Sequence, residues 1–212
     1  MNFDDLMEPV RTDLEELDLA REEVLRLTRL IIRSSGEAIK AIHRKNFQLA
    51  KGKLDAAQKN MQAIHSITEK RAELRFQGYV TSAAQELGEA ALLYAYLHEN
   101  RLLSASELAI HSYPYLMALA DFIGELRRCI LDDLRKNEFD RIEMILETMD
   151  ELMTALFSLD FVEGLLPGFR RKVDFGRMLV ERTRGDVTNA LPREQLRKEL
   201  QRLSDLLTKH NK

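Results

Sequence analysis

The sequence predicts an all-α fold, a single-domain bundle of about seven helices that covers residues 1–212. Hydrophobic residues recur every three or four positions along nearly the whole chain, which is the period of an amphipathic helix. The 212 residues include only nine glycines and four prolines, and aromatic residues make up 7%. Strands favour aromatic and β-branched residues and need frequent turns, so this composition argues against a sheet.

The first half of the chain is expected to form three long helices and one short one. Residues 9–45 carry the first pattern, and Pro9 is suited to the first turn of that helix. The next two helices are predicted over residues 47–72 and 74–99. After a turn, the Ser104 hydroxyl is suited to cap a short helix.

Three more helices are expected, over residues 114–134, up to residue 161 and over 169–184. Asn137 or Asp140 is suited to cap the middle one of these. The segment GDVTNALP is expected to end the last one, with Gly185 as its C-cap. Residues 192–212 then form a short amphipathic C-terminal tail.

Overall charge and cysteine content limit the classes of protein. The net charge of −3 indicates no particular partner, and a single cysteine, Cys129, excludes an intramolecular disulfide and a cysteine-based zinc site. Because the chain has neither a signal peptide nor a run of 18 apolar residues, we expect a cytoplasmic protein that does not associate with a membrane. Basic clusters at 38–62 and 169–184 are either solvated helix faces or surfaces for a phosphate backbone.

Two apolar helices each carry a pair of carboxylates. Glu86 and Glu89 are the only charged groups of residues 79–97, and Asp121 and Glu125 are the only ones between Tyr113 and Leu126. Spacings of three and four place each pair on one helix face. A buried carboxylate must become protonated, form an ion pair or bind a metal ion.

If the two helices face each other, the four carboxylates converge. Oxygen ligands without His or Cys suit a hard cation such as Mg²⁺, Mn²⁺ or Ca²⁺, and acids with Mg²⁺ commonly serve phosphoryl chemistry. The alternative is a solvated polar stripe that is paired with arginines elsewhere, such as Arg75, Arg127 and Arg128. The five histidines are scattered without the spacing of metal ligands.

Four segments resemble Trax, the translin-associated member of the translin family. QELGEA at 85–90, before an aromatic-rich helix and RLLS, is similar to its Gln-Glu-x-x-Glu-Ala pattern. YLMALADFIGELRRCILD at 115–132 is similar to its Tyr-Leu-x-x-x-Ala-Asp-x-x-Gly-Glu-Leu-x-Arg pattern. DRIEMILETMDELMTAL and GFRRKVDFGRMLVERTRGD look like the leucine-rich and basic helices of its C-terminal half.

The resemblance implies a fold and an activity. Family members are seven-helix bundles that assemble into hollow octamers around nucleic acid, and Trax cleaves RNA with Mg²⁺ or Mn²⁺. The resemblance carries the acidic set over to Glu86, Glu89, Asp121 and Glu125. The matching nucleic-acid-binding stretch is KRAELRFQGY, where Arg71 and Arg75 are the counterparts, although Gln77 and Tyr79 stand where histidines are expected.

The chain is more compact than eukaryotic Trax, since it lacks a long basic N-terminal extension. That compactness resembles the stand-alone archaeal members, so we expect a homo-oligomer, an octamer, that needs no translin partner. The predicted activity is an endoribonuclease that acts on single-stranded RNA or short duplexes. The charge pattern adds Lys40, Arg44 and Lys45 as further candidates for backbone contacts.

Two alternatives stay open. An all-α nucleoside triphosphate pyrophosphohydrolase also places paired acids of facing helices around Mg²⁺, although there the second pair runs Glu-x-x-x-Asp and here it runs Asp-x-x-x-Glu. A non-catalytic, translin-like nucleic-acid-binding protein would keep its carboxylates for structural reasons.

Overall fold

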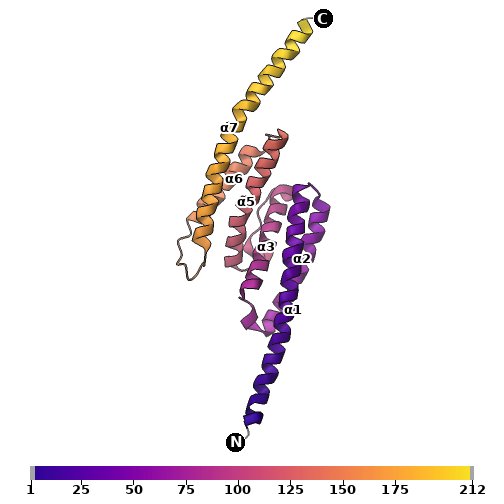
Figure 1. Ribbon diagram of the computed structural model, residues 1–212, viewed down its shortest axis with the longest axis vertical. Coiled ribbons are helices and arrows are strands. Elements are labelled where there is room, and N and C mark those ends of the chain that lie inside the picture. Colours follow the sequence, from indigo (N-terminus) through magenta and orange to yellow (C-terminus); the bar gives the residue numbers. More distant parts are fainter. Residues whose placement is uncertain (1–2, 211–212) are drawn as a thin grey trace. The chain divides into compact units, whose positions relative to one another are not determined.

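The computed structural model describes residues 3–210, and every regular element in that range is helical (Figure 1), which confirms the all-α prediction. The α-helices of this range are α1 (Phe3–His43), α2 (Phe47–Lys70), α3 (Gly78–Tyr94), α4 (Ala105–Leu108), α5 (Ser112–Lys136), α6 (Ile142–Phe157) and α7 (Phe169–His210). Beyond Pro192 the described side chains are those of Glu194, Leu196, Arg197, Glu199, Leu200, Arg202 and Leu203.

The chain divides into two compact units, Met1–Phe122 and Ile123–Lys212. In the first unit α1 packs along α2 and α3, and in the second α6 packs on α7. Helix α5 runs from one unit into the other without interruption. The expectation of a single domain stays a prediction.

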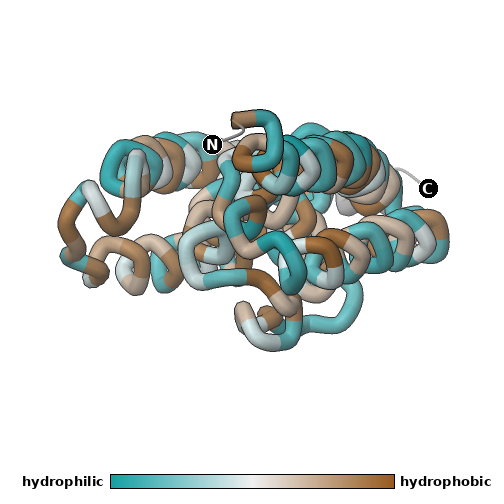
Figure 2. The backbone as a smooth tube through the Cα atoms, turned by 90° about the horizontal axis from the view of Figure 1, so that it is seen from below, coloured by the Kyte–Doolittle hydropathy of each residue, from teal (hydrophilic) through white to brown (hydrophobic). Residues whose placement is uncertain are grey.

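Each unit has its own apolar core, built from one face of amphipathic helices. Hydrophobic and hydrophilic residues follow one another along the tube of each helix (Figure 2). The fully buried side chains of the first unit include Ile31, Met61 and Leu92, and those of the second include Ile130 and Ile142. Burial of each such side chain contributes about 1.5–3 kcal/mol, which explains why the helical period is so regular.

Cys129 is a small core residue, since it is buried in the second unit and burial raises its pKa to about 12. No helix within residues 3–210 combines the length and the apolar character that a membrane crossing needs.

Three expectations about the first half of the chain have different outcomes in the structure. Helix α1 begins at Phe3, so the placement of Pro9 in the first turn is wrong and this proline lies inside the helix. The segment expected as one helix over 74–99 is not a single helix, because a 3₁₀ turn (Ala72–Leu74) ends at its first residue, α3 begins only at Gly78 and a π-helical turn (Ala95–Glu99) follows α3. The cap at Ser104 is confirmed, since its hydroxyl accepts the backbone N–H of Glu107 at 3.3 Å.

Two expectations about the second half are wrong. Neither Asn137 nor Asp140 caps α6, because Arg141 holds the N-cap position and makes no side-chain cap. Helix α7 does not end at Gly185 but continues through GDVTNALP into the tail. Val180, Thr183 and Val187 are buried at helical spacing, and this packing outweighs the cost of a helical glycine, about 1 kcal/mol.

Candidate metal and nucleic-acid site

Helices α3 and α5 approach each other closely because small residues lie at their contact. A Cβ atom added to Gly88 would lie 2.9 Å from Cβ of Ala118 and 3.1 Å from Cδ1 of Ile110, so only glycine fits at this point of α3. Glu89 directly follows Gly88, and Asp121 lies three residues after Ala118 on α5. The contact therefore brings the acidic stretch of α3 and Asp121 of α5 to the same region of the first unit.

One hydrogen bond joins the two helices at the predicted acidic residues. The Gln85 side-chain amide donates from Nε2 to Oδ2 of Asp121 at 2.6 Å. Gln85 precedes Glu89 by one helical turn and is adjacent to Glu86. The side chains of these three residues and of Asp121 are half-buried. The structure thus places Asp121 of α5 against the acidic stretch of α3, as expected for facing helices.

Gln85 is the site residue that was missed from the sequence. It stands in the QELGEA motif, but its side chain is neutral, so the pattern of charged residues does not distinguish it. Its role is visible only across the helix pair. An amide donor fixes the orientation of a carboxylate and leaves its negative charge in place.

Glu125 lies one turn after Asp121 on α5 and belongs to the second unit. Its side chain is 18% exposed, and Oε2 lies 3.7 Å from Nη1 of Arg128 on the same helix. Arg127 forms its ion pair elsewhere, with Asp186 of α7 at 2.9 Å. Of the three arginines considered as partners of the acids, Arg128 thus lies within ion-pair distance of one of them.

The chemistry of the four carboxylates fits a hard divalent cation, because all the ligating atoms would be oxygens. Partial burial also fits, since a bound cation is held more tightly where water is partly excluded. Within residues 3–210, no three His, Cys, Asp or Glu side chains are arranged to hold a metal ion. The ligand set Glu86, Glu89, Asp121 and Glu125 therefore stays a prediction.

The two arginines expected to bind nucleic acid differ in their surroundings. Arg71 donates to Asp13 of α1 at 2.6 Å and to Glu16 at 2.7 Å, and these hydrogen bonds raise its pKa. Arg75, four residues later, is half-buried, and no described residue forms an ion pair with it. Arg71 must give up ion pairs to reach a phosphate, whereas Arg75 need not.

Arg75 belongs to a group of basic and aromatic side chains that includes two of the five histidines. The spacing of the histidines along the sequence did not indicate this group. Burial and then the positive charges of His111 and Arg75 lower the pKa of His65. Phe76 is 71% exposed, and its ring centroid lies 5.2 Å from that of His111. These side chains come from three segments, so only the folded chain brings them together.

The three other basic candidates lie together where α1 ends and α2 begins. Lys40 is in the last turn of α1, and Arg44 and Lys45 follow in the connection. All three side chains are exposed, which is required for contact with a phosphate backbone. Lys45 has a φ of 58°, so it turns the chain before Asn46 caps α2.

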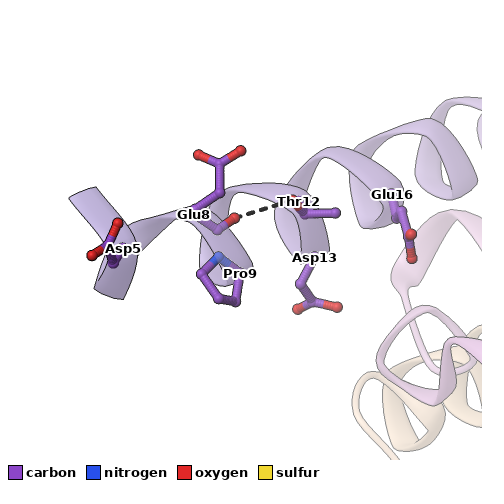
Figure 3. Close-up of a pocket in the computed structure, with 6 residues that line it drawn as sticks. All are labelled: Asp5, Glu8, Pro9, Thr12, Asp13 and Glu16. Carbon is purple, nitrogen blue, oxygen red and sulfur yellow. Dashed lines mark hydrogen bonds between the residues drawn. The ribbon is translucent and has the colours of Figure 1, made fainter. Parts of the chain in front are cut away.

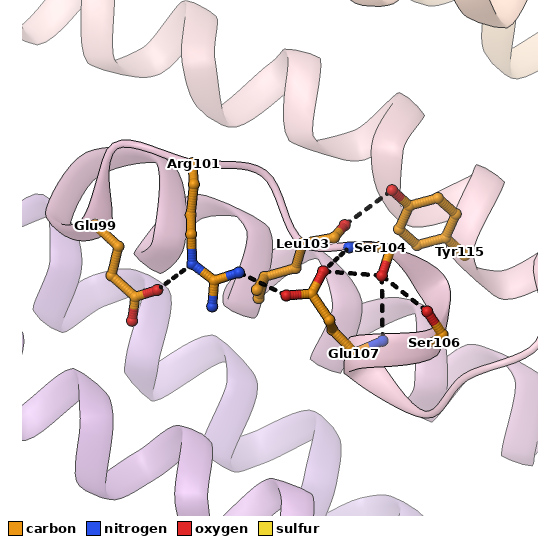
Figure 4. A network of polar contacts seen from close by, with 7 residues as sticks. All are labelled: Glu99, Arg101, Leu103, Ser104, Ser106, Glu107 and Tyr115. Atoms are coloured by element: carbon orange, nitrogen blue, oxygen red, sulfur yellow. Dashed lines mark hydrogen bonds and ion pairs between the residues drawn. The ribbon is translucent and has the colours of Figure 1, made fainter.

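A polar network holds the connection between α3 and α5 in place (Figure 4). Arg101 donates to Glu99 at 2.9 Å and to Glu107 at 2.6 Å, and Glu107 also accepts the backbone N–H of Ser104 at 2.8 Å. The Tyr115 hydroxyl donates to the Leu103 carbonyl at 2.9 Å, which ties the first turn of α5 to the same connection. The network therefore restrains where α5 begins relative to α3.

The family model described as Translin family matches residues 19–183, which include every candidate acid of the site. The chain belongs to the translin family. That membership agrees with the likeness of the four quoted segments and with the all-α fold.

Several relatives of this translin-family chain are known. It is 31% identical over 192 residues to the uncharacterized protein MJ0175 of Methanocaldococcus jannaschii, an alignment that covers 90% of this chain and 85% of that protein. The crystal structure of AfC3PO matches with a TM-score of 0.80 and 30% identity, over 87% of this chain and 96% of the other.

Two further solved structures are similar. AfC3PO in complex with duplex RNA matches with a TM-score of 0.80 and 29% identity, over 87% of this chain and 95% of the other. Apo-NeC3PO matches with a TM-score of 0.75 over 84% of this chain and 92% of the other, and at 20% identity this likeness concerns the fold alone.

Proposed function

We propose that this translin-family protein is a Mg²⁺- or Mn²⁺-dependent endoribonuclease of the Trax type that acts within a homo-oligomeric shell. The observation that carries the proposal is the junction of α3 and α5, where Gln85 donates to Asp121 beside Glu86 and Glu89. The similarity to AfC3PO, whose structure is known in complex with duplex RNA, supports RNA as the ligand of this chain.

Each acidic residue has a role in this proposal. Glu86, Glu89, Asp121 and Glu125 would hold one or two divalent cations, which when bound polarise the phosphate and lower the pKa of water. One of the four carboxylates takes the proton of the attacking water as the new P–O bond forms, the bond to the leaving ribose oxygen breaks, and that oxygen takes up a proton from solvent. Gln85 keeps Asp121 oriented through its amide hydrogen bond.

The basic residues hold the RNA backbone. Arg75 is the principal candidate, because no described residue forms an ion pair with it. Exposed Lys40, Arg44 and Lys45 would add sequence-independent contacts with phosphates. Arg71 contributes only if its ion pairs with Asp13 and Glu16 open.

Cleavage of labelled RNA tests the proposal directly. The wild-type chain should cleave RNA with Mg²⁺ or Mn²⁺ and lose this activity in EDTA, and Asp121→Ala should abolish cleavage while RNA binding persists. Asp132→Asn is a matched control, because Asp132 lies on the same helix and pairs with Arg135 at 3.0 Å. Unchanged cleavage by Asp121→Ala would remove the assignment, and cleavage of nucleoside triphosphates instead of RNA would favour the pyrophosphohydrolase.

A second candidate function is RNA binding without cleavage. It is favoured by the finding that no group of three potential ligands is arranged for a metal ion in the described part of the chain. Under this alternative the wild-type chain binds RNA with equal affinity in Mg²⁺ and in EDTA and cleaves it in neither.

A further inference from the structure

The first turns of α1 carry an apolar stripe that no described residue of the first unit covers. We call residues 3–17 the N-terminal arm. In it Phe3 is 72% exposed, Met7 52%, Val10 48% and Leu14 56%. Their spacing of four, three and four residues is that of a helix that packs against another helix.

The stripe is the continuation of a buried seam on the same helix. Counting on from Leu14 in steps of three and four leads to the buried residues Val24, Thr28, Ile31 and Ser35. The end of α2 reaches only the last part of the arm, where Arg71 pairs with Asp13 and Glu16. The N-terminal end of α1 extends beyond α2 and α3 in Figure 1, so its apolar face lacks a partner within its own unit.

Acidic side chains surround the stripe. The arm holds six acids and a single basic residue, Arg11. An open surface pocket on the arm is lined by Asp5, Glu8, Pro9, Thr12, Asp13 and Glu16. Figure 3 shows the carboxylates of the four acidic residues among them. A partner of this face must therefore offer both apolar area and positive charge.

The outer side of α7 in the second unit offers both. Arg171, Phe175, Met178 and Arg182 follow one another at the same spacing of four, three and four residues, and Phe175 is 55% and Met178 45% exposed. This stripe lies opposite the buried seam of α7, which includes Val173. We call these four residues the outer stripe of α7.

Positive charge accompanies the outer stripe. Arg171 and Arg182 belong to the stripe itself, whereas Arg170 and Arg177 lie nearer the buried seam, and Arg177 is stacked over Phe157 of α6 with 5.8 Å between its guanidinium carbon and the ring centroid. No described residue forms an ion pair with any of the arginines at positions 170, 171, 177 and 182. Arginine at an interface pairs readily with carboxylates through its planar fork of donors.

We propose that the N-terminal arm of one copy packs along the outer stripe of α7 of a second copy, with Met7 and Val10 against Phe175 and Met178. The proposal rests on the homo-oligomeric part of the proposed function and names its interface. Charge selects the pairing, because two arms would bring like charges together, whereas arm and outer stripe are complementary. Each copy carries one arm and one outer stripe, so the same contact can repeat from copy to copy.

Disulfide cross-linking between two different variants tests which segments meet. A Val10→Cys chain and a longer, tagged Met178→Cys chain are mixed and oxidised. Cys129 does not compete, because it is buried and its pKa is raised to about 12. The expected product is a covalent pair of one chain of each kind, and Leu19→Cys, which is 73% exposed on the opposite side of α1, should give none with Met178→Cys.

Three outcomes of cross-linking would overturn the inference. The first is a pair of two Val10→Cys chains, which would mean that arm packs on arm. The second is a bond within a single chain that carries both substitutions. The third is no cross-link at all while the assembly is intact, in which case the proposed function stands and only this interface fails.

Sedimentation velocity gives an independent readout. Met7→Glu and Phe175→Glu should each weaken assembly by roughly tenfold or more, as expected for central anchors of an interface, and Leu19→Glu should leave it unchanged. A monomeric wild-type chain would refute both the interface and the shell of the proposed function. If Arg171→Glu with Arg182→Glu lowers RNA affinity but not assembly, the outer stripe binds RNA and the inference is wrong.

Discussion

Two aspartates of α5 are held in different ways. Asp133 is 1% exposed and accepts two hydrogen bonds from Arg141, at 2.7 and 3.0 Å. Asp121, twelve residues earlier, is half-buried and accepts from the neutral amide of Gln85 at 2.6 Å. A guanidinium neutralises the carboxylate that it binds, whereas an amide only orients it.

Under the proposed function, α5 carries one acid for stability and another for chemistry. Full burial is tolerated at Asp133 because a matched cation lies beside it. At Asp121 the partial exposure keeps the carboxylate accessible to a ligand from solution, and the amide limits its rotation. The comparison can be tested by substitutions that affect activity at one end of α5 and stability at the other.

The largest effect is expected for the acids of α3. Glu89→Gln keeps the size of the side chain and removes its charge, so RNA cleavage with Mg²⁺ or Mn²⁺ should fall roughly 10²- to 10³-fold. Single-turnover cleavage measures this loss, and circular dichroism should show an unchanged melting temperature. Glu69→Gln, at an exposed position of α2, is the control. Full activity of Glu89→Gln would exclude this residue from the site.

The next effect concerns the stability of the Asp133 pair. Arg141→Met leaves a buried carboxylate without its cation, and the free energy of unfolding should fall by about 3 kcal/mol. Urea unfolding measures the change. Adding Asp133→Leu to this variant should restore much of the stability, since the uncompensated charge is then gone. A double variant as unstable as Arg141→Met alone would show that the charge is not the cause.

A smaller effect, on RNA affinity, is expected to distinguish Arg75 from Arg71. Arg75→Gln should weaken RNA binding by roughly threefold to tenfold and reduce its salt dependence, because one phosphate contact is lost. Arg71→Gln should have less effect on RNA affinity, since Arg71 is paired with Asp13 and Glu16. Fluorescence anisotropy at several salt concentrations measures both. Equal losses would mean that the ion pairs of Arg71 open on binding.

The smallest effect is expected at the exposed cap of α4. Ser104→Ala removes the hydroxyl that accepts from Glu107, and the free energy of unfolding should fall by about 1 kcal/mol. Thermal unfolding at neutral pH measures this change. Thr154→Ala is the control, because its hydroxyl lies on an exposed helix face and caps nothing.

The same cap gives a pH dependence with a defined sign. Hydrogen bonds from the Ser104 backbone, Arg101 and the Ser104 hydroxyl lower the pKa of Glu107 from 4.5 to about 2. Its contribution to stability is therefore complete above pH 4.5 and is lost as the pH falls toward 2. Glu107→Gln should flatten that part of the stability profile, and an unchanged profile would contradict this assignment.

Local pattern was sufficient for much of the fold and for part of the candidate site. The period of hydrophobic residues identified the helices, and the spacings of Glu86 with Glu89 and of Asp121 with Glu125 placed each pair on one face. Ser104 was identifiable as a cap because its hydroxyl acts within one turn of chain. These features depend on residues within about four positions of one another.

Tertiary structure decided what depends on distant parts of the chain. Helix α7 continues past Gly185 because Thr183 and Val187 are buried, an energy that local propensity does not contain. Gln85 acquires its role from Asp121, 36 residues away, and Arg71 is paired by Asp13, 58 residues away. Periodicity indicates which face of a helix is apolar, but only packing determines whether that face is covered, as the buried seam and the exposed arm of α1 show.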